Sequence, residues 1–169
     1  MDHFSITTSL ARNQNIFKVL LGGISKEEYL WKSQPDKWCM LEIVCHLHDE
    51  EREDFRFRVK HILENPELAL PSIDPPAWVH ERKYMDQDFE SVVEKFLSER
   101  EISLNWLQTL ESPKWENVHH HPKLGEMTAK MMLTNWLAHD YLHIRQIIKL
   151  KFDFLQVKSN ESLSYAGAW

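Results

Sequence analysis

The sequence contains few of the residues that mark disulfide-rich and turn-rich proteins. Of its 169 residues, only two are cysteines and only four are glycines. On one helix, Cys39 and Cys45 would lie about 240° apart at roughly 100° per residue, so they cannot pair with each other. A chain without a disulfide framework is typical of intracellular proteins, and scarce glycine favours long helices. We therefore expect a helical, cytoplasmic protein.

Long apolar runs and an excess of basic charge are also missing. No apolar stretch approaches the roughly 18 residues that a membrane span needs, and the start, MDHFSITTSLARNQ, lacks the basic and apolar regions of a signal peptide. The formal net charge is −6, and the basic residues are scattered among Glu and Asp. A nucleic-acid surface requires clustered Lys and Arg. We therefore expect neither a membrane nor a nucleic acid as partner.

The apolar residues that are present indicate one compact helical domain. With 43% hydrophobic residues, residues 1–169 can bury a single core. The apolar periodicity and the Gly and Pro breaks predict four helices, over about 5–21, 36–64, 86–110 and 125–152. We see no period-two alternation that predicts a strand. The connectors, roughly 15 to 20 residues each, exceed the roughly 2 to 8 residues of a simple bundle. We expect an all-α fold, a four-helix bundle with long crossover connections, with residues 153–169 lying against it.

Two histidines lie one turn apart in the last predicted helix, within NWLAHDYLHIRQIIKL (135–150). This helix is apolar almost all round, which indicates that His139 and His143 are buried. A buried imidazole that leaves a ring nitrogen unpaired costs roughly 1–3 kcal/mol. Two rings at this spacing can share one divalent ion, as in HxxxH zinc helices. Core histidines and an interhelical hydrogen bond are the alternatives.

A third metal ligand would have to come from another helix, and the second predicted helix offers two histidines in CHLHDEEREDFRFR. His46 shares a mixed polar face with Asp49, Glu50 and Glu53, whereas His48 lies on an apolar stripe. Helical periodicity alone therefore slightly favours His48 as the inward residue. The acidic run itself fits a solvated helix face with ion pairs equally well.

Two further patterns resemble metal motifs less closely. Asp140 follows His139 directly, where HExxH proteases carry a glutamate base. Asp is one methylene shorter, so we expect Asp140 to support a ligand or to face solvent. In HHHPKLG (119–125), three consecutive histidines in a loop cannot all face one ion. We expect a polar connector there, with His121 at the mouth of a pocket.

Together, three segments of the chain resemble the DinB-like superfamily, which includes metal-binding helical bundles related to bacillithiol transferase. They are KWCMLEIVCHLHDEEREDFRFRVKHIL, HPKLGEMT and LAHDYLHIRQI, and the resemblance spans about residues 31–148. It implies a four-helix bundle of unusual crossover topology. It also implies a divalent metal bound by one histidine of the second helix and two of the last. By position, these ligands are His46, His139 and His143, so the resemblance favours His46 over His48.

Three imidazoles would leave coordination positions open, unlike a closed four-ligand structural site. A metal there acidifies water for hydrolysis, or a thiol for transfer to an electrophile, and characterised relatives favour the thiol. We therefore expect a divalent-metal-dependent enzyme with a small-molecule substrate, thiol S-transferase-like or hydrolase-like. Its expected cofactors are a divalent metal ion, zinc or nickel, and a low-molecular-weight thiol.

The alternative is a stress-related binding protein whose metal is structural or vestigial. The seven tryptophans and eight phenylalanines are compatible with a homodimer. Because imidazole ligands must be deprotonated, metal affinity is expected to fall below roughly pH 6.5.

Overall fold

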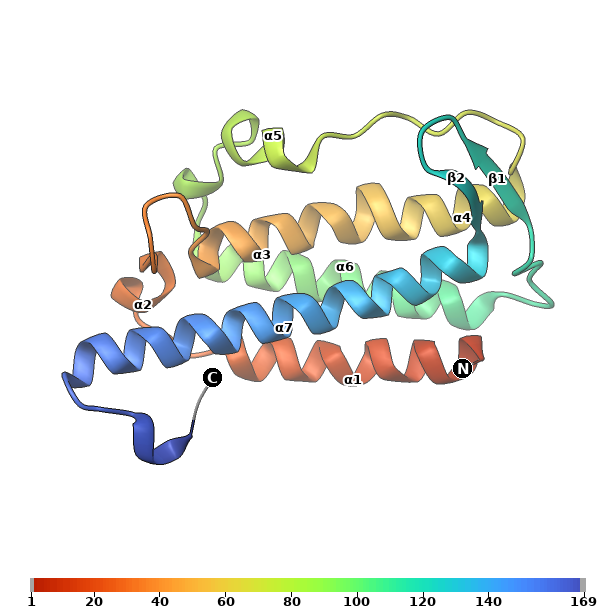
Figure 1. The fold of residues 1–169 in the computed structure, drawn as a ribbon. Helices are drawn as coiled ribbons and strands as arrows, with labels where there is room; N and C mark the ends of the chain where they lie inside the picture. The colour runs from red at the N-terminus through yellow and green to blue at the C-terminus, as the bar shows by residue number, and fades with distance from the viewer. Residues whose placement is uncertain (1, 168–169) are drawn as a thin grey trace.

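The structure, a computed structural model, describes residues 2–167 as a bundle of four long helical segments (Figure 1). The first is α1 (His3–Leu21), and the third and fourth are α6 (Phe89–Thr109) and α7 (Ala129–Ser159). The second comprises α3 (Met40–Asp49), the π-helical turn η1 (Glu50–Phe55) and α4 (Arg56–Glu64), which follow one another without a break. The predicted all-α four-helix bundle is confirmed.

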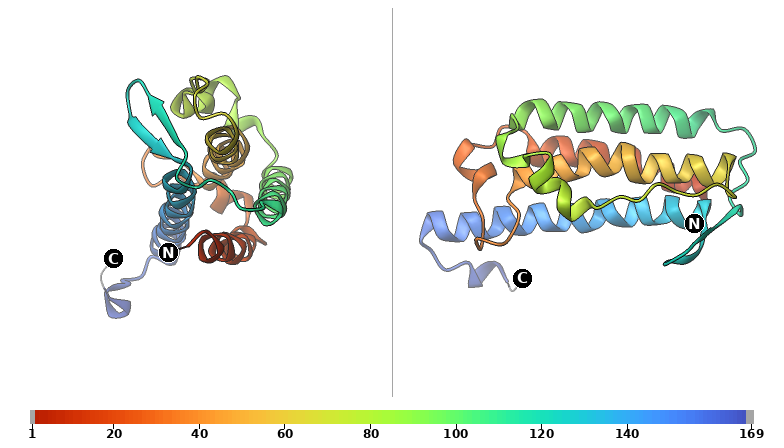
Figure 2. Two further views of the ribbon diagram at one scale, coloured as in Figure 1. Left: turned by 90° about the vertical axis from the view of Figure 1, so that its right-hand side faces the viewer. Right: turned by 90° about the horizontal axis from the view of Figure 1, so that it is seen from above.

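The connection between the second and third segments produces the crossover topology. The segment α3–η1–α4 runs in the same direction as α6, whereas α1 and α7 run the opposite way (Figure 1). Both α1 and α3–η1–α4 pack against α6 and α7, so the first two long segments lie at opposite corners of the bundle (Figure 2). Because two parallel helices follow each other in the chain, residues 65–88 must return along the bundle. The predicted long crossover is confirmed.

Short helices interrupt the connectors, which the sequence did not predict. The first connector contains α2 (Lys26–Leu30), and the second contains α5 (Pro75–Glu81) and η2 (Tyr84–Asp86). The prolines of the second connector were predicted only as a break after the second long helix, but α5 begins on two of them. The side chain of Asp74 accepts a hydrogen bond from the N–H of Ala77. Proline at the first helical position loses no hydrogen bond, because that N–H has no intrahelical partner.

A β-hairpin precedes α7, so the prediction of no strand was wrong. Strand β1 (Val118–His121) pairs antiparallel with β2 (Gly125–Thr128). The last helix therefore begins at Ala129 rather than near residue 125, and the Thr128 side chain caps it by accepting from the N–H of Met131 at 2.9 Å. The strands are short and mostly polar, and this explains why no alternating pattern revealed them.

Two other helix ends differ from the prediction. The second long helix begins at Met40 rather than at Asp36, because the Glu42 carboxylate accepts from the N–H of Cys39 at 2.9 Å. At the other end of the chain, α7 continues to Ser159. Residues 160–167, with η3 (Ser164–Ala166), are largely exposed, so the prediction that this part of the tail lies against the bundle was wrong; residues 168–169 lie outside the described residues. No helix within residues 2–167 combines the length and apolar character needed to cross a membrane.

The core is divided into two apolar halves by a layer of polar side chains. One half contains Phe17, the apolar residues of α3, and Phe96. The other half contains Phe55 and the apolar residues at the start of α7. Buried polar residues lie between these halves along the chain, one on each long segment: Asn13, Glu51, Arg100 and Asp140. The predicted histidine ligands lie beside this layer.

Candidate metal centre

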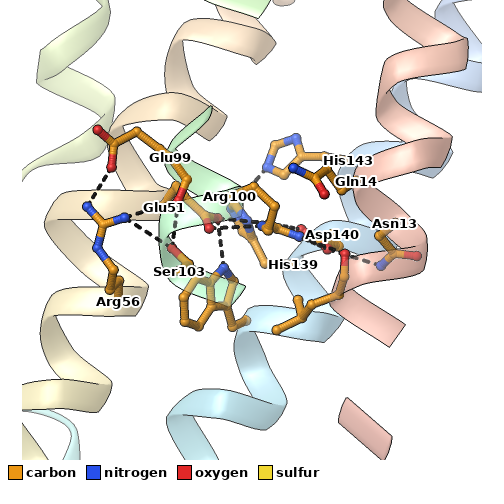
Figure 3. Close-up of polar contacts among 12 residues, drawn as sticks. Asn13, Gln14, Glu51, Arg56, Glu99, Arg100, Ser103, His139, Asp140 and His143 are labelled. Carbon is orange, nitrogen blue, oxygen red and sulfur yellow. Dashed lines mark hydrogen bonds and ion pairs between the residues drawn. The ribbon is translucent and has the colours of Figure 1, made fainter. Parts of the chain in front are cut away.

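Three histidine rings from two helices meet in the middle of the bundle. The Nε2 atom of His139 lies 3.2 Å from Nε2 of His46 and 3.0 Å from Nε2 of His143. The three candidate ligand atoms all lie within 4.8 Å of one another. His139 and His143 are adjacent because a spacing of four residues places them one turn apart on α7, as Figure 3 shows.

The structure places His48 outside this cluster. Its Nδ1 atom lies 3.4 Å from the Asp49 carboxylate, and its side chain lines a separate cavity of about 200 Å³ beside Cys45 and Tyr84. His46, in contrast, is 7% exposed and faces α7. The choice of His48 from periodicity was therefore wrong for this cluster, and the choice of His46 from the resemblance agrees with the geometry.

Aromatic side chains hold the cluster from two sides. The Trp38 ring packs against the His46 ring at a centroid distance of 5.0 Å. The Phe55 ring packs against His139 at 4.9 Å. Packed rings restrict the rotation of the imidazoles and keep water from part of the site, which fixes the direction of the Nε2 atoms.

The arrangement of protons and lone pairs fits a cation. Nδ1 of His143 lies 2.9 Å from Oε1, the side-chain amide oxygen of Gln146, so Nδ1 donates and Nε2 carries a lone pair rather than a proton. A single neutral Nε2 of His139 cannot form a good hydrogen bond with both neighbouring Nε2 atoms. Three nitrogens bound to zinc at about 2.0–2.1 Å in tetrahedral geometry would lie about 3.3 Å apart, close to the two separations of 3.0 and 3.2 Å from His139. The three histidines therefore suit one divalent ion.

Burial keeps the three imidazoles neutral. It lowers the pKa of His46 to about 3 and that of His139 to about 2, with the neighbouring His143 as the second cause in each case. Burial also lowers the pKa of His143. Neutral rings are the form that binds metals. The expected loss of metal affinity on acidification therefore shifts well below the pH of 6.5 that the sequence predicted.

The metal-free protein is expected to lose stability as the pH falls below about 6.5. In the unfolded chain, the histidines bind protons with a pKa near 6.5, whereas in the folded chain their pKa values are lowered. Stability is therefore fully present above pH 6.5 and is lost on acidification. The pKa of Glu50 is raised to about 8, so protonation of Glu50 stabilises the folded state as the pH falls. This is one titrating group, whereas three histidines destabilise the folded state over the same pH range. Urea unfolding at pH 7.5 and 5.5 tests this, and an equal or higher free energy of unfolding at pH 5.5 would refute it.

A buried ionic network connects the helices that carry the histidines (Figure 3). The Arg100 guanidinium binds both carboxylate oxygens of Glu51 at 2.9 and 2.8 Å. It also binds both oxygens of Asp140 at 2.7 Å each. Asn13 and Trp136 complete the network by donating to Asp140 and Glu51. One guanidinium from α6 thus links η1, which follows His46, to the residue next to His139.

This network explains why Asp140 is buried, and it shows that part of the acidic run of the second helix is not a solvent-facing surface. Asp140 is completely buried, so it supports the helix beside His139 rather than facing solvent. In the acidic run, Glu50 and Glu51 are also buried, and the solvated-face hypothesis is wrong for both. Burial raises the pKa of Glu50 to about 8, and nearby Asp54 adds to this effect. Sequence analysis did not identify Arg100, because the stretch SEREIS (98–103) resembles an ordinary charged helix surface.

The remaining predicted candidates lie away from the cluster. His119 is buried, with Nδ1 2.8 Å from the carbonyl of Pro66, whereas His120 is exposed. Nδ1 of His121 accepts from two backbone N–H groups of the hairpin turn, and its side chain lines a cavity, as expected. Burial raises the pKa of the unpaired Cys39 and Cys45 thiols to about 11 and about 12, so neither is a nucleophile at neutral pH.

Two cavities are lined by residues that contact the histidines, while none of the three histidines is itself among the lining residues. One of about 640 Å³ is lined by Trp38 and Gln146, which contact His46 and His143. Another of about 530 Å³ is lined by Phe55, which contacts His139, and by Asn135, one turn before it. Both volumes are typical of small-molecule sites.

Comparisons with known proteins agree with this architecture. YfiT from Bacillus subtilis, described as a probable metal-dependent hydrolase with an unusual four-helix bundle topology, superposes with a TM-score of 0.78 and 17% sequence identity. The match covers 95% of this chain and 89% of YfiT, and at this identity it shows a shared fold. No curated protein matches the sequence. The family model of the DinB superfamily matches residues 9–147. Because this match covers most of the chain, the protein belongs to the DinB superfamily.

Proposed function

We propose that the protein is a divalent-metal-dependent enzyme for a small-molecule substrate, with His46, His139 and His143 as its metal ligands. The convergence of three Nε2 atoms at separations of 3.0 and 3.2 Å carries this proposal. The description of YfiT as a probable metal-dependent hydrolase supports it. Imidazole ligands suit zinc or nickel.

The reaction that we propose is hydrolysis or the transfer of a thiol to an electrophile. A divalent ion with open positions supplies the same chemistry to both, since it lowers the pKa of a water or a thiol that binds it. The cysteines of this chain are buried and protonated, so thiol transfer would use a low-molecular-weight thiol as cofactor.

The side chains around the cluster have distinct roles in this proposal. Gln146 holds the proton on Nδ1 of His143 and keeps Nε2 available. The rings of Trp38 and Phe55 exclude water from the protein side of the site. Glu50, with Oε1 4.0 Å from Nδ1 of His46, holds a proton at neutral pH because its pKa is raised to about 8.

The proposed enzyme should lose its activity, but keep its helices, when the metal is removed. The test compares zinc-loaded, nickel-loaded and chelated protein on a panel of esters and amides, and on a thiol with a chromogenic electrophile. We expect turnover with metal only, and its loss in His143→Ala. If chelation instead lowers the melting temperature steeply and no preparation turns over any substrate, a binding protein with a structural metal replaces the enzyme.

Three expectations remain proposals alongside this function. They are that residues 1–169 form a single domain, that the protein is cytoplasmic, and that it forms a homodimer. Gel filtration with light scattering measures the last of these directly.

A further inference from the structure

The cavity beside Trp38 and Gln146 is basic, although the chain as a whole has a net charge of −6. Three cationic side chains line it, against one carboxylate: Lys37, Arg145 and Lys149 against Asp153. Lys149 is paired with Asp153 at 2.5 Å. The excess positive charge therefore comes from Lys37 and Arg145, and a concave surface of one sign of charge attracts ligands of the other sign.

Both of these cations are able to bind a ligand. Arg145 lies on the exposed side of α7 and has no ion-pair or hydrogen-bond partner among residues 2–167. Lys37 lies 3.3 Å from Asp36, and both side chains are more than half exposed. Such a surface pair contributes little, so a ligand can displace it. The guanidinium fork also matches the geometry of a carboxylate or another oxyanion.

The wall of the same cavity contacts two of the three histidines. Arg145 is two residues from His143, and Gln146, which accepts from His143, is part of the cavity wall. Trp38, which also lines the cavity, packs against His46. Arg145 is therefore placed to contact the far end of a molecule that reaches the histidines past Trp38 or Gln146.

From this placement we infer that the small molecule that reacts at the histidine cluster carries an oxyanionic group, bound by Arg145 and Lys37. The inference rests on the proposed metal-dependent function and narrows its substrate class. Carboxylates and sulfonates share the required chemistry. Neutral analogues of the same molecule would bind more weakly, because they leave the basic cavity unpaired.

The test uses the full chain loaded with cobalt(II), and three small thiols that differ only at the far end. These probes are 3-mercaptopropanoate, 3-mercaptopropanesulfonate and 3-mercaptopropanamide, and the thiolate–cobalt absorption band reports their binding. We expect the preference for an anionic probe over the amide to fall roughly tenfold from the wild type to the double variant Arg145→Gln/Lys37→Gln. Intrinsic differences between the probes cancel in this comparison. Lys60→Gln, which removes an exposed charge outside the cavity, should retain the wild-type preference.

The outcomes separate this inference from the proposed function. Cobalt uptake with an equal anion preference in the wild type and the double variant would overturn the inference alone. A protein that takes up no cobalt would contradict the proposed function, and the inference with it. If only one of the two anionic probes shows the roughly tenfold effect, the inference stands and that probe identifies the oxyanion.

Discussion

Replacing Arg100 with methionine is expected to lower the free energy of unfolding by about 3–5 kcal/mol, because it leaves buried carboxylates without their cation. Arg100 is 1% exposed and binds all four carboxylate oxygens of Glu51 and Asp140. For a chain of this size, 1 kcal/mol corresponds to about 2–4 °C in melting temperature. Thermal unfolding should therefore shift by on the order of 10 °C.

Two control variants separate the charge from the packing. In Arg56→Met, the removed guanidinium is paired with Glu99 in a partly exposed position, and the expected loss is about 1 kcal/mol or less. Adding Glu51→Gln and Asp140→Asn to Arg100→Met removes the unpaired charges and should restore part of the stability. A stability of Arg100→Met equal to that of the wild type would show that the network does not hold the helices together.

Changing His143 to alanine is expected to abolish metal binding while the bundle remains folded. The variant removes one of three ligands, so affinity should fall by more than the roughly 10- to 100-fold that loss of a supporting contact costs. Elemental analysis should show one ion per chain in the wild type and a small fraction of that in the variant. Circular dichroism should show the same helix content in both.

His120→Ala and His48→Ala are the matched controls for this experiment. The His120 side chain is 76% exposed, and that of His48 lines the separate cavity, so both variants should retain the ion. Full metal content in His143→Ala would remove His143 from the proposed site. Loss of the ion in His48→Ala would return the choice of ligand to His48.

Periodicity predicted the long helices but failed to identify the inward histidine of the second one. The residues of α3 are buried almost all round, because α6, α7 and α5 surround this helix. A helix covered on all sides has no single inward stripe. In addition, η1 winds as a π-helix, which has more residues per turn than an α-helix. Leu41 and Phe55, which would share one apolar face with His48 on an ideal α-helix, are therefore rotated relative to each other around the helix axis. The family resemblance supplied His46 where periodicity could not.

The burial of Arg100 and its ion pairs could not be predicted for a different reason. Its partners Glu51 and Asp140 are 49 and 40 residues away in the chain, and all three lie in segments with other charged residues. Only the tertiary arrangement, in which the Arg100 side chain crosses the middle of the bundle to reach Glu51 and Asp140, distinguishes this buried cation from its exposed neighbours. The hairpin was missed because its strands are four residues each, too short for a period to be visible.

The central claim is that His46, His139 and His143 bind one divalent ion through their Nε2 atoms. An anomalous difference map from crystals of the zinc-loaded protein tests it most directly. The predicted result is one peak between α3 and α7, about 2.0–2.1 Å from each Nε2 atom. A peak bound by other residues, or no peak at this cluster in zinc-saturated crystals, would contradict the account.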